Sequence, residues 1–228
     1  LILTGSNAQD KKAQNPVIFA DVPDLSIIRV RNDYYMSSTT MHMSPGVPIM
    51  KSKDLINWKI ISYASNTLGN SDELNLDNGK NNYGRGSWAS NIRYHNNTFY
   101  VTTFAQTTGK TYVYTTKDIE KGPWKEMSFS PAYHDHSILF DDDGKVYMVY
   151  GNCKLFIKEL KPDLSGIKEN GLDQVLIENA NSPAGNAIML GAEGSQLYKI
   201  KGKYYLFNIV WPKDGMRTVL IHRADKIT

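Results

Sequence analysis

Short runs in which apolar and polar residues alternate recur along the chain, and most of them end at a turn rich in Asn, Asp or Gly. Such alternation is typical of β-strands that bury one face, and no stretch of the sequence combines helical periodicity with capping residues. Four segments share one order of elements: a short strand, a tight turn, and a second strand rich in aromatic and β-branched residues. These segments are 24–38, 89–103, 135–150 and 193–207. The pattern predicts an all-β protein.

A second repeated phrase follows the hairpin. It consists of an apolar strand, a turn that contains Asp and an outer strand that carries Trp, and it occupies 48–59, 112–125 and, incompletely, 219–228. Units of four antiparallel strands in series are the signature of a β-propeller. The last copy stops at Thr228, so we expect the fourth unit to lack its end. Two polar inserts, 69–85 and 179–192, are expected to be loops.

Composition excludes several classes of protein. The 228 residues, 41% apolar and 21% charged, suit one globular domain. No apolar run approaches the ~20 residues of a membrane-spanning helix, so no membrane span is expected. The 26 Lys and Arg residues outnumber the 23 Asp and Glu residues only slightly and are spread along the chain, which argues against a nucleic-acid partner. The single Cys153 excludes an internal disulfide and a cysteine-based zinc site.

The first residues differ from the rest of the chain. Residues 1–8 read as the apolar end of a secretory signal peptide cut near Ala8, and the alternative is a frayed terminus. The first interpretation predicts an exported protein, located in the periplasm, on the cell surface or outside the cell. Residues 15–228 then form the catalytic propeller domain.

Position within the repeat indicates where the chemistry lies. Asp24, Asp135 and Glu193 occupy the same place, the start of the first strand of a unit, and the second unit has Ala89 there with Trp88 beside it. The first strand of a propeller blade lines the central axis, so the three carboxylates should converge on one pocket. The alternative is that each acid only caps a strand or faces solvent.

Converging carboxylates have a chemical use in glycoside hydrolysis. One acid protonates the leaving oxygen, and a second carboxylate acts from the other side of the sugar. A third carboxylate at ~6 Å would raise the pKa of the proton donor by roughly two units, since the repulsion is about 2.8 kcal/mol at an effective dielectric of ~20. The 14 Tyr, 7 Phe and 4 Trp residues pack cores, but such rings also serve sugar-binding clefts as stacking platforms.

Four stretches of the chain resemble glycoside hydrolase family 43, in the order in which that family has them: 15–26, 52–58, 87–94 and 193–199. The resemblance implies a five-bladed propeller, of which the fifth blade is absent from this chain, and an inverting enzyme. Most members are β-xylosidases, α-L-arabinofuranosidases or arabinanases. The resemblance further implies that Asp24 is the general base, Asp135 the residue that adjusts the pKa of the acid, and Glu193 the general acid.

Three further residues are candidates for substrate binding. Trp88 borders the sugar site or packs in the core, and Arg217 points to the substrate, as the resemblance implies, or lies on the surface. His42 reaches the mouth of the pocket or belongs to a solvated loop.

No metal site is assigned from the sequence, and no cofactor is expected to be required. His134 and His136 flank Asp135, yet the sequence offers no evident third ligand for zinc. The resemblance implies a structural calcium ion in the channel, for which no ligand can be named. Residues 141–144 are expected to form a hairpin turn rather than a calcium loop.

The favoured interpretation is an inverting, β-xylosidase-like hydrolase of pentose glycosides in xylan or arabinoxylan, whose partner is an oligo- or polysaccharide. An α-L-arabinofuranosidase or arabinanase with the same site is the alternative within the family. A non-catalytic carbohydrate-binding propeller is the alternative from another class, but a binder has no use for three carboxylates in register.

Overall fold

The computed structural model describes residues 13–42 and 44–228, and within them β-strands form four antiparallel sheets. The first sheet, blade one, contains β1 (Ser26–Val30), β2 (Asp33–Ser37), β3 (Gly46–Ser52) and β4 (Lys59–Ser65). Blade two contains β5 (Ser90–His95), β6 (Thr98–Ala105), β7 (Lys110–Thr116) and β8 (Lys125–Phe129). Blade three contains β9 (Ser137–Phe140), β10 (Val146–Asn152), β11 (Lys154–Leu160) and β12 (Asp173–Ile177). Blade four contains β13 (Ile188–Ile200), β14 (Lys203–Pro212) and β15 (Thr218–Ala224).

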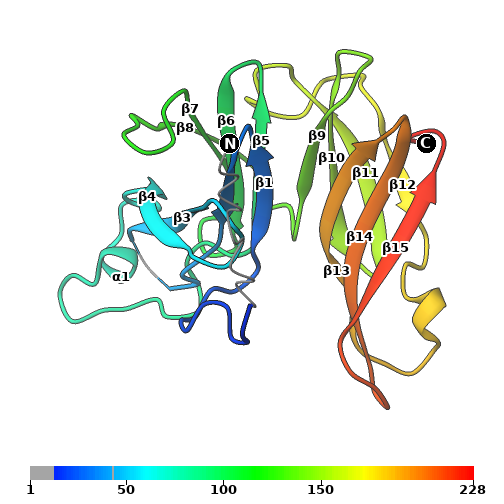
Figure 1. The fold of residues 1–228 in the computed structure, drawn as a ribbon, viewed down its shortest axis with the longest axis horizontal. Helices are drawn as coiled ribbons and strands as arrows, with labels where there is room; N and C mark the ends of the chain where they lie inside the picture. Colours follow the sequence, from blue (N-terminus) through cyan, green and yellow to red (C-terminus); the bar gives the residue numbers. More distant parts are fainter. Residues whose placement is uncertain (1–12, 43) are drawn as a thin grey trace, which may run out of the picture.

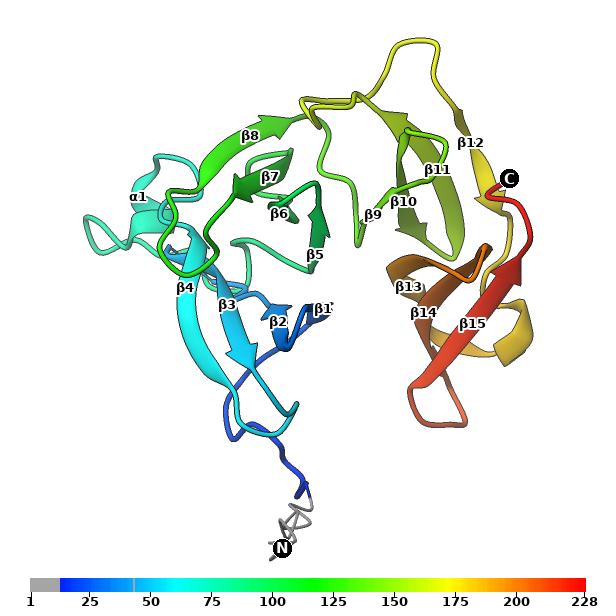
Figure 2. The same ribbon diagram turned by 45° about the horizontal axis from the view of Figure 1, so that its top comes forward.

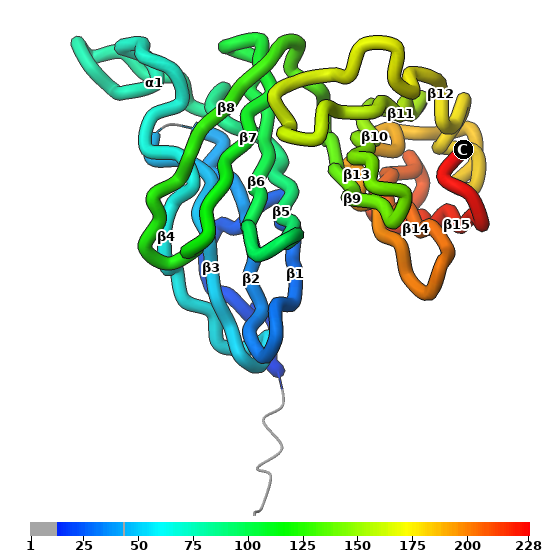
Figure 3. The backbone as a smooth tube through the Cα atoms, turned by 90° about the horizontal axis from the view of Figure 1, so that it is seen from above, coloured from blue at the N-terminus to red at the C-terminus, as the bar shows by residue number. Residues whose placement is uncertain are grey.

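The four sheets are the blades of a propeller (Figure 1). They follow one another in an arc around a common centre, with β1, β5, β9 and β13 on the inner side (Figure 2). Viewed from above, blades one and two lie on one side and blades three and four on the other (Figure 3). The predicted all-β propeller is confirmed, and the described residues form three blades of four strands, one of three, and no fifth blade.

The hairpins follow from the turn residues. Asn96 and Asn97 link β5 to β6 with φ values of 46° and 58°, the left-handed conformation that a two-residue type I′ turn requires and that Asn tolerates. Residues 141–145 turn between β9 and β10, as expected for 141–144.

Two details of the strand predictions are wrong. Trp58 and Trp124 lie one residue before the outer strands β4 and β8 and not on them. The insert 179–192 is only partly a loop: after the short 3-10 helix η1 (Ser182–Ala184), β13 begins at Ile188, where apolar residues pair irregularly with the end of β14. The insert 69–85 contains α1 (Asp72–Asn75), a single helical turn capped by Ser71.

Apolar side chains from adjacent blades meet to form the core. One cluster joins blades one and two, where the rings of Tyr35 and Phe99 contact edge to face at 5.3 Å. A second cluster joins blades two and three around Val113 and Met148, and a third joins blades three and four around Val149 and Leu206. Each of the four blades thus buries at least one face against a neighbouring blade.

Polar side chains tie the inner strands together near the axis. Arg93 on β5 is buried, and its guanidinium donates to the Ile138 carbonyl at 2.9 Å and to the Leu197 carbonyl at 3.0 Å. Asn91 donates to the Gln196 side chain at 2.9 Å, and Gln196 accepts a further hydrogen bond from Ser26 across the axis at 3.0 Å. These bonds set the positions of β1, β9 and β13 relative to one another.

None of the helices in the described part of the chain is long and apolar enough to cross a membrane. Residues 1–8, the predicted remnant of a signal peptide, lie outside the described residues.

Candidate active site

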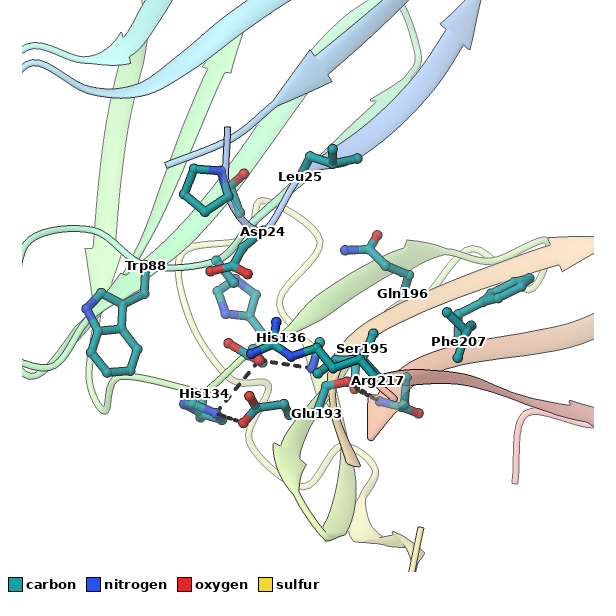
Figure 4. Close-up of a pocket in the computed structure, with 18 of the residues that line it drawn as sticks. Asp24, Leu25, Trp88, His134, His136, Glu193, Ser195, Gln196, Phe207 and Arg217 are labelled. Carbon is teal, nitrogen blue, oxygen red and sulfur yellow. Dashed lines mark hydrogen bonds and ion pairs between the residues drawn. The ribbon is translucent and has the colours of Figure 1, made fainter. Parts of the chain in front are cut away.

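A cavity of about 610 Å³ opens at one end of the axis, and Asp24, Asp135 and Glu193 all line it. They come from three different blades, beside the starts of β1 and β9 and within β13. Figure 4 shows Asp24 and Glu193 directed into the same space. The predicted convergence of the three carboxylates on one cavity is therefore confirmed.

The local backbone explains how the acids reach the cavity. Asp24 and Asp135 each precede a buried Ser by two residues and have φ values of 49° and 46°, a left-handed conformation that Asp tolerates better than most residues. Glu193 lies where the pairing of β13 with β14 is irregular, and Gly194 after it has a φ of 66°. Each acid thus stands at a bend of the chain.

Two side chains that the repeat did not single out hold the Glu193 carboxylate. Its Oε2 atom lies 3.0 Å from Nε2 of His134 (Figure 4). The same atom accepts a hydrogen bond from the Asn152 amide at 2.6 Å. The His134 ring is itself packed edge-on against Phe104, with centroids 5.3 Å apart. The carboxylate is therefore fixed in orientation from two sides.

These contacts reverse one prediction. Burial alone would raise the pKa of Glu193, but the hydrogen bonds from His134 and Asn152 outweigh burial and hold this pKa below its usual value. The same hydrogen bond, which the Glu193 carboxylate accepts, raises the pKa of His134 against the opposing effect of burial. The expected upward shift of the Glu193 pKa is wrong, because the prediction counted only neighbouring carboxylates.

Asp135 is the carboxyl group whose pKa rises most clearly. Burial and then the Glu193 charge raise it, against the attraction of His134, and the resulting pKa is about 6. Its Oδ2 atom accepts the Gly194 backbone N–H at 2.9 Å and lies 3.8 Å from Nε2 of His134. Burial, followed by repulsion from Glu193, also raises the pKa of Asp24. The carboxyl groups are thus close enough to repel one another.

Trp88 and Arg217 line the cavity as well. The Trp88 indole donates to the Gly84 carbonyl at 3.1 Å and packs against Phe104. Arg217 lies in the exposed connection between β14 and β15, with its guanidinium 5.2 Å from the centre of the Trp211 ring. At both Asp24 and Glu193 its charge acts against burial: it reduces the rise of the Asp24 pKa and adds to the lowering of the Glu193 pKa.

His42 is not among the residues that line the cavity in the described part of the chain; Met41 is. The Nδ1 atom of His42 accepts the Gly84 backbone N–H at 2.8 Å, and its ring contacts Tyr83. His42 therefore supports the loop that carries Trp88.

A cation has one candidate site in the described residues. Ligand atoms of His134, Asp135 and Glu193 lie within 4.8 Å of one another. Calcium takes six to eight oxygen ligands, so one imidazole nitrogen and two carboxylates do not fit it. His136 points elsewhere: it is buried and bonded to the Tyr133 carbonyl and the Thr102 hydroxyl.

Comparison with known proteins agrees with this geometry. A model of the glycosyl hydrolases family 43 matches residues 13–223. The chain is 34% identical over 214 residues to a β-xylosidase of Formosa agariphila, covering 90% of this chain and 35% of the relative. It is 31% identical over 201 residues to a non-reducing end α-L-arabinofuranosidase of Bacteroides ovatus, covering 87% of this chain and 36% of the relative.

Solved structures agree too. A bifunctional GH43-CE structure from Bacteroides eggerthii superposes with a TM-score of 0.91 at 69% identity, covering 95% of this chain and 28% of that one. The chain spans about a third of the length of the curated relatives named above. The resemblance seen in the sequence is confirmed: the chain belongs to glycoside hydrolase family 43.

Proposed function

We propose that the protein is an inverting glycoside hydrolase that cleaves pentose glycosides of xylan or arabinoxylan. The observation that carries the proposal is the meeting of Asp24, Asp135 and Glu193 from three blades in one cavity. A cavity that places repelling carboxyl groups together is costly to fold, and acid–base catalysis is the use that such groups have on a sugar.

In this mechanism Asp24 is the general base and Glu193 the general acid. Asp24 takes a proton from a water molecule while the water oxygen bonds to the anomeric carbon. As the bond from that carbon to the leaving oxygen breaks, Glu193 gives its proton to this oxygen. One displacement inverts the configuration, and we expect the two carboxyl groups to be about 6.5–9.5 Å apart so that the water fits between base and sugar.

His134 supplies the proton that the acid needs. The imidazolium of His134 and the carboxylate of Glu193, 3.0 Å apart, together hold one proton that either group can carry. A sugar in the cavity displaces water, and loss of water disfavours a pair of charges relative to a neutral imidazole beside a neutral carboxylic acid. Substrate binding therefore moves the proton onto Glu193, and a nearby ionised Asp135 favours this state because like charges repel.

The substrate class rests on the relatives. Several are called β-xylosidases or xylosidase/arabinosidases, and one is an α-L-arabinofuranosidase. We place β-xylosidase activity first and arabinofuranosidase or arabinanase activity second. Because polysaccharides do not enter cells, we also propose that the protein is exported, which cell fractionation tests.

The test is hydrolysis of nitrophenyl pentosides and of xylo- and arabino-oligosaccharides, with NMR detection of the anomer that is formed first. An inverted product, lost in Asp24→Asn, is the expected result. A product of retained configuration would refute the mechanism, and binding without turnover of any substrate would identify a carbohydrate-binding propeller instead.

A further inference from the structure

A second cavity, of about 500 Å³, lies on the outer side of the propeller between blades one and two. It is bounded by the end of β4, by β7 and by the turn that leads into β8. We call it the rim groove; its lining includes Tyr63, Asn66, Tyr114, Trp124 and Glu126. None of its lining residues belongs to the lining of the axial cavity among the described residues.

Unpartnered polar atoms gather at the rim groove. Within the described residues, two of the six buried side-chain nitrogen or oxygen atoms without a hydrogen-bond partner belong to residues that line it: the Tyr114 hydroxyl and the Trp124 indole nitrogen. Buried polar groups are normally satisfied, so these atoms indicate a ligand that supplies hydrogen bonds.

The internal repeat shows that Trp124 departs from its own pattern. In blade one, Trp58 follows Leu55 by three residues and donates its indole N–H to the Leu55 carbonyl at 3.0 Å. In blade two, Trp124 follows the matching Ile119 by five residues, since the turn is longer and includes Gly122 with a φ of 71°. The longer turn separates the indole from the turn carbonyl, which leaves its N–H free for another acceptor.

The lining has the chemistry of a sugar site. Tyr63 is 37% exposed, so its ring offers a surface for stacking, and Trp124 is partly buried beside it in the same cavity. The carboxyl group of Glu126 and the amide of Asn66 add acceptors and a donor. An apolar ligand would leave the indole N–H and the Tyr114 hydroxyl unsatisfied. An anion would meet the carboxylates of Glu120 and Glu126 against the single ammonium group of Lys121. Aromatic faces with neutral hydrogen-bonding groups suit a saccharide.

We propose that the rim groove binds a sugar unit of the polysaccharide, at a distance from the reaction, and so holds the protein on its polymer. The identity of the polymer rests on the proposed function. Bonds from the ligand hydroxyls would satisfy the Trp124 indole and the Tyr114 hydroxyl, which no group of the described chain does.

The test uses the indole N–H signals of the tryptophans in ¹H–¹⁵N NMR spectra, with xylohexaose as the probe and Asp24→Ala to prevent hydrolysis. Trp124 reports on the rim groove, Trp88 on the axial cavity, and Trp58 is the matched control with its N–H already bonded. The Trp124 signal should shift in a saturable way while the Trp58 signal stays. Tyr114→Phe, which keeps the ring, should weaken this binding about 3- to 10-fold.

A shift of the Trp88 signal without any shift of the Trp124 signal would overturn the proposal, because the groove would then bind no saccharide. A shift of Trp124 without Trp88 would support the groove and count against the proposed active site. In the active protein, Trp124→Phe should reduce retention on insoluble xylan while kcat/KM on a nitrophenyl pentoside stays within twofold. Trp58→Phe should change neither, and equal loss of retention in both variants would also refute the proposal.

Discussion

Asp135→Asn should make the protein more stable and less active. Asp135 has a pKa of about 6 in the folded protein, chiefly because it is buried, against 3.8 for an ordinary Asp. Asn has nearly the same shape, tolerates the left-handed backbone at this position, and can accept the Gly194 N–H through its carbonyl oxygen. The substitution therefore removes the charge and little else.

The magnitude follows from linkage. Between pH 3.8 and about pH 6 the folded protein keeps the Asp135 proton that the unfolded chain has released, so the free energy of unfolding falls as the pH rises through this window. Each pKa unit is worth about 1.4 kcal/mol, so an ionised Asp135 costs the folded state about 3 kcal/mol above pH 6. Asp135→Asn should recover about that amount near pH 8 and almost nothing near pH 3.5.

The assay is urea unfolding of the parent and the variant across this pH range. Asp142→Asn is the control, since the Asp142 side chain is 84% exposed and its replacement should change stability by less than about 0.5 kcal/mol. Activity should fall in Asp135→Asn, because Glu193 loses the repulsion that helps it hold a proton. A variant that is less stable than the parent near pH 8, or a gain that does not depend on pH, would refute the reasoning.

Three further predictions follow from the contacts. Asp141→Asn should have the opposite pH dependence. Burial would raise the Asp141 pKa, but hydrogen bonds from Lys199 and Tyr204 outweigh burial and hold this pKa below its usual value. Urea unfolding should therefore show a loss of stability that is present at neutral pH and disappears as the pH falls through the lowered pKa. His134→Phe keeps the ring packing but loses the hydrogen bond to Glu193, so it should lower kcat/KM about 10- to 100-fold on xylo-oligosaccharides and less on nitrophenyl pentosides. His134→Gln retains a donor and should restore part of this loss. Equal losses in the two variants would contradict the role assigned to His134. Gly191→Ala should reduce kcat/KM on oligosaccharides about tenfold. A Cβ atom there would overlap Sγ of Cys153 and lie 2.5 Å from Oδ1 of Asn152, so it should displace the amide that holds Glu193; an unchanged rate would show that this amide does not matter.

The blades and the convergence of the acids could be predicted because both depend on local, repeated signals. Alternation of apolar residues and the Asn, Asp and Gly turns define each hairpin. The similar spacing from each acid to the aromatic strand then puts Asp24, Asp135 and Glu193 at the same position in their blades, the start of the first strand. Where the local signal was weak the prediction failed: the apolar residues 188–190 lie in a polar insert, and only their pairing with β14 shows that β13 begins there.

The charge state of the site could not be predicted in the same way. His134 lies 59 residues from Glu193 along the chain and Asn152 lies 41 residues from it. Nothing in the repeat specifies that the His134 ring turns toward blade four; its packing against Phe104 and Trp88 does so in the folded protein. The position of each acid within the repeat identified which carboxyl groups meet. The direction of the pKa change of Glu193, however, depends on these neighbours that are distant in the sequence.

Blade two explains why the cavity is charged on some sides only. At the place of the acids it has Ala89, and here the chain is held by hydrogen bonds from the Thr103 hydroxyl to the Trp88 and Ala89 carbonyls at 2.9 and 3.2 Å. Neither residue is among the described residues with positive φ, unlike Asp24 and Asp135. The chain therefore enters β5 without the left-handed bend, and it brings the Trp88 side chain to the cavity. A fourth carboxylate would add repulsion to a site where burial already raises two carboxyl pKa values, whereas an aromatic wall gives the sugar a face to lie against.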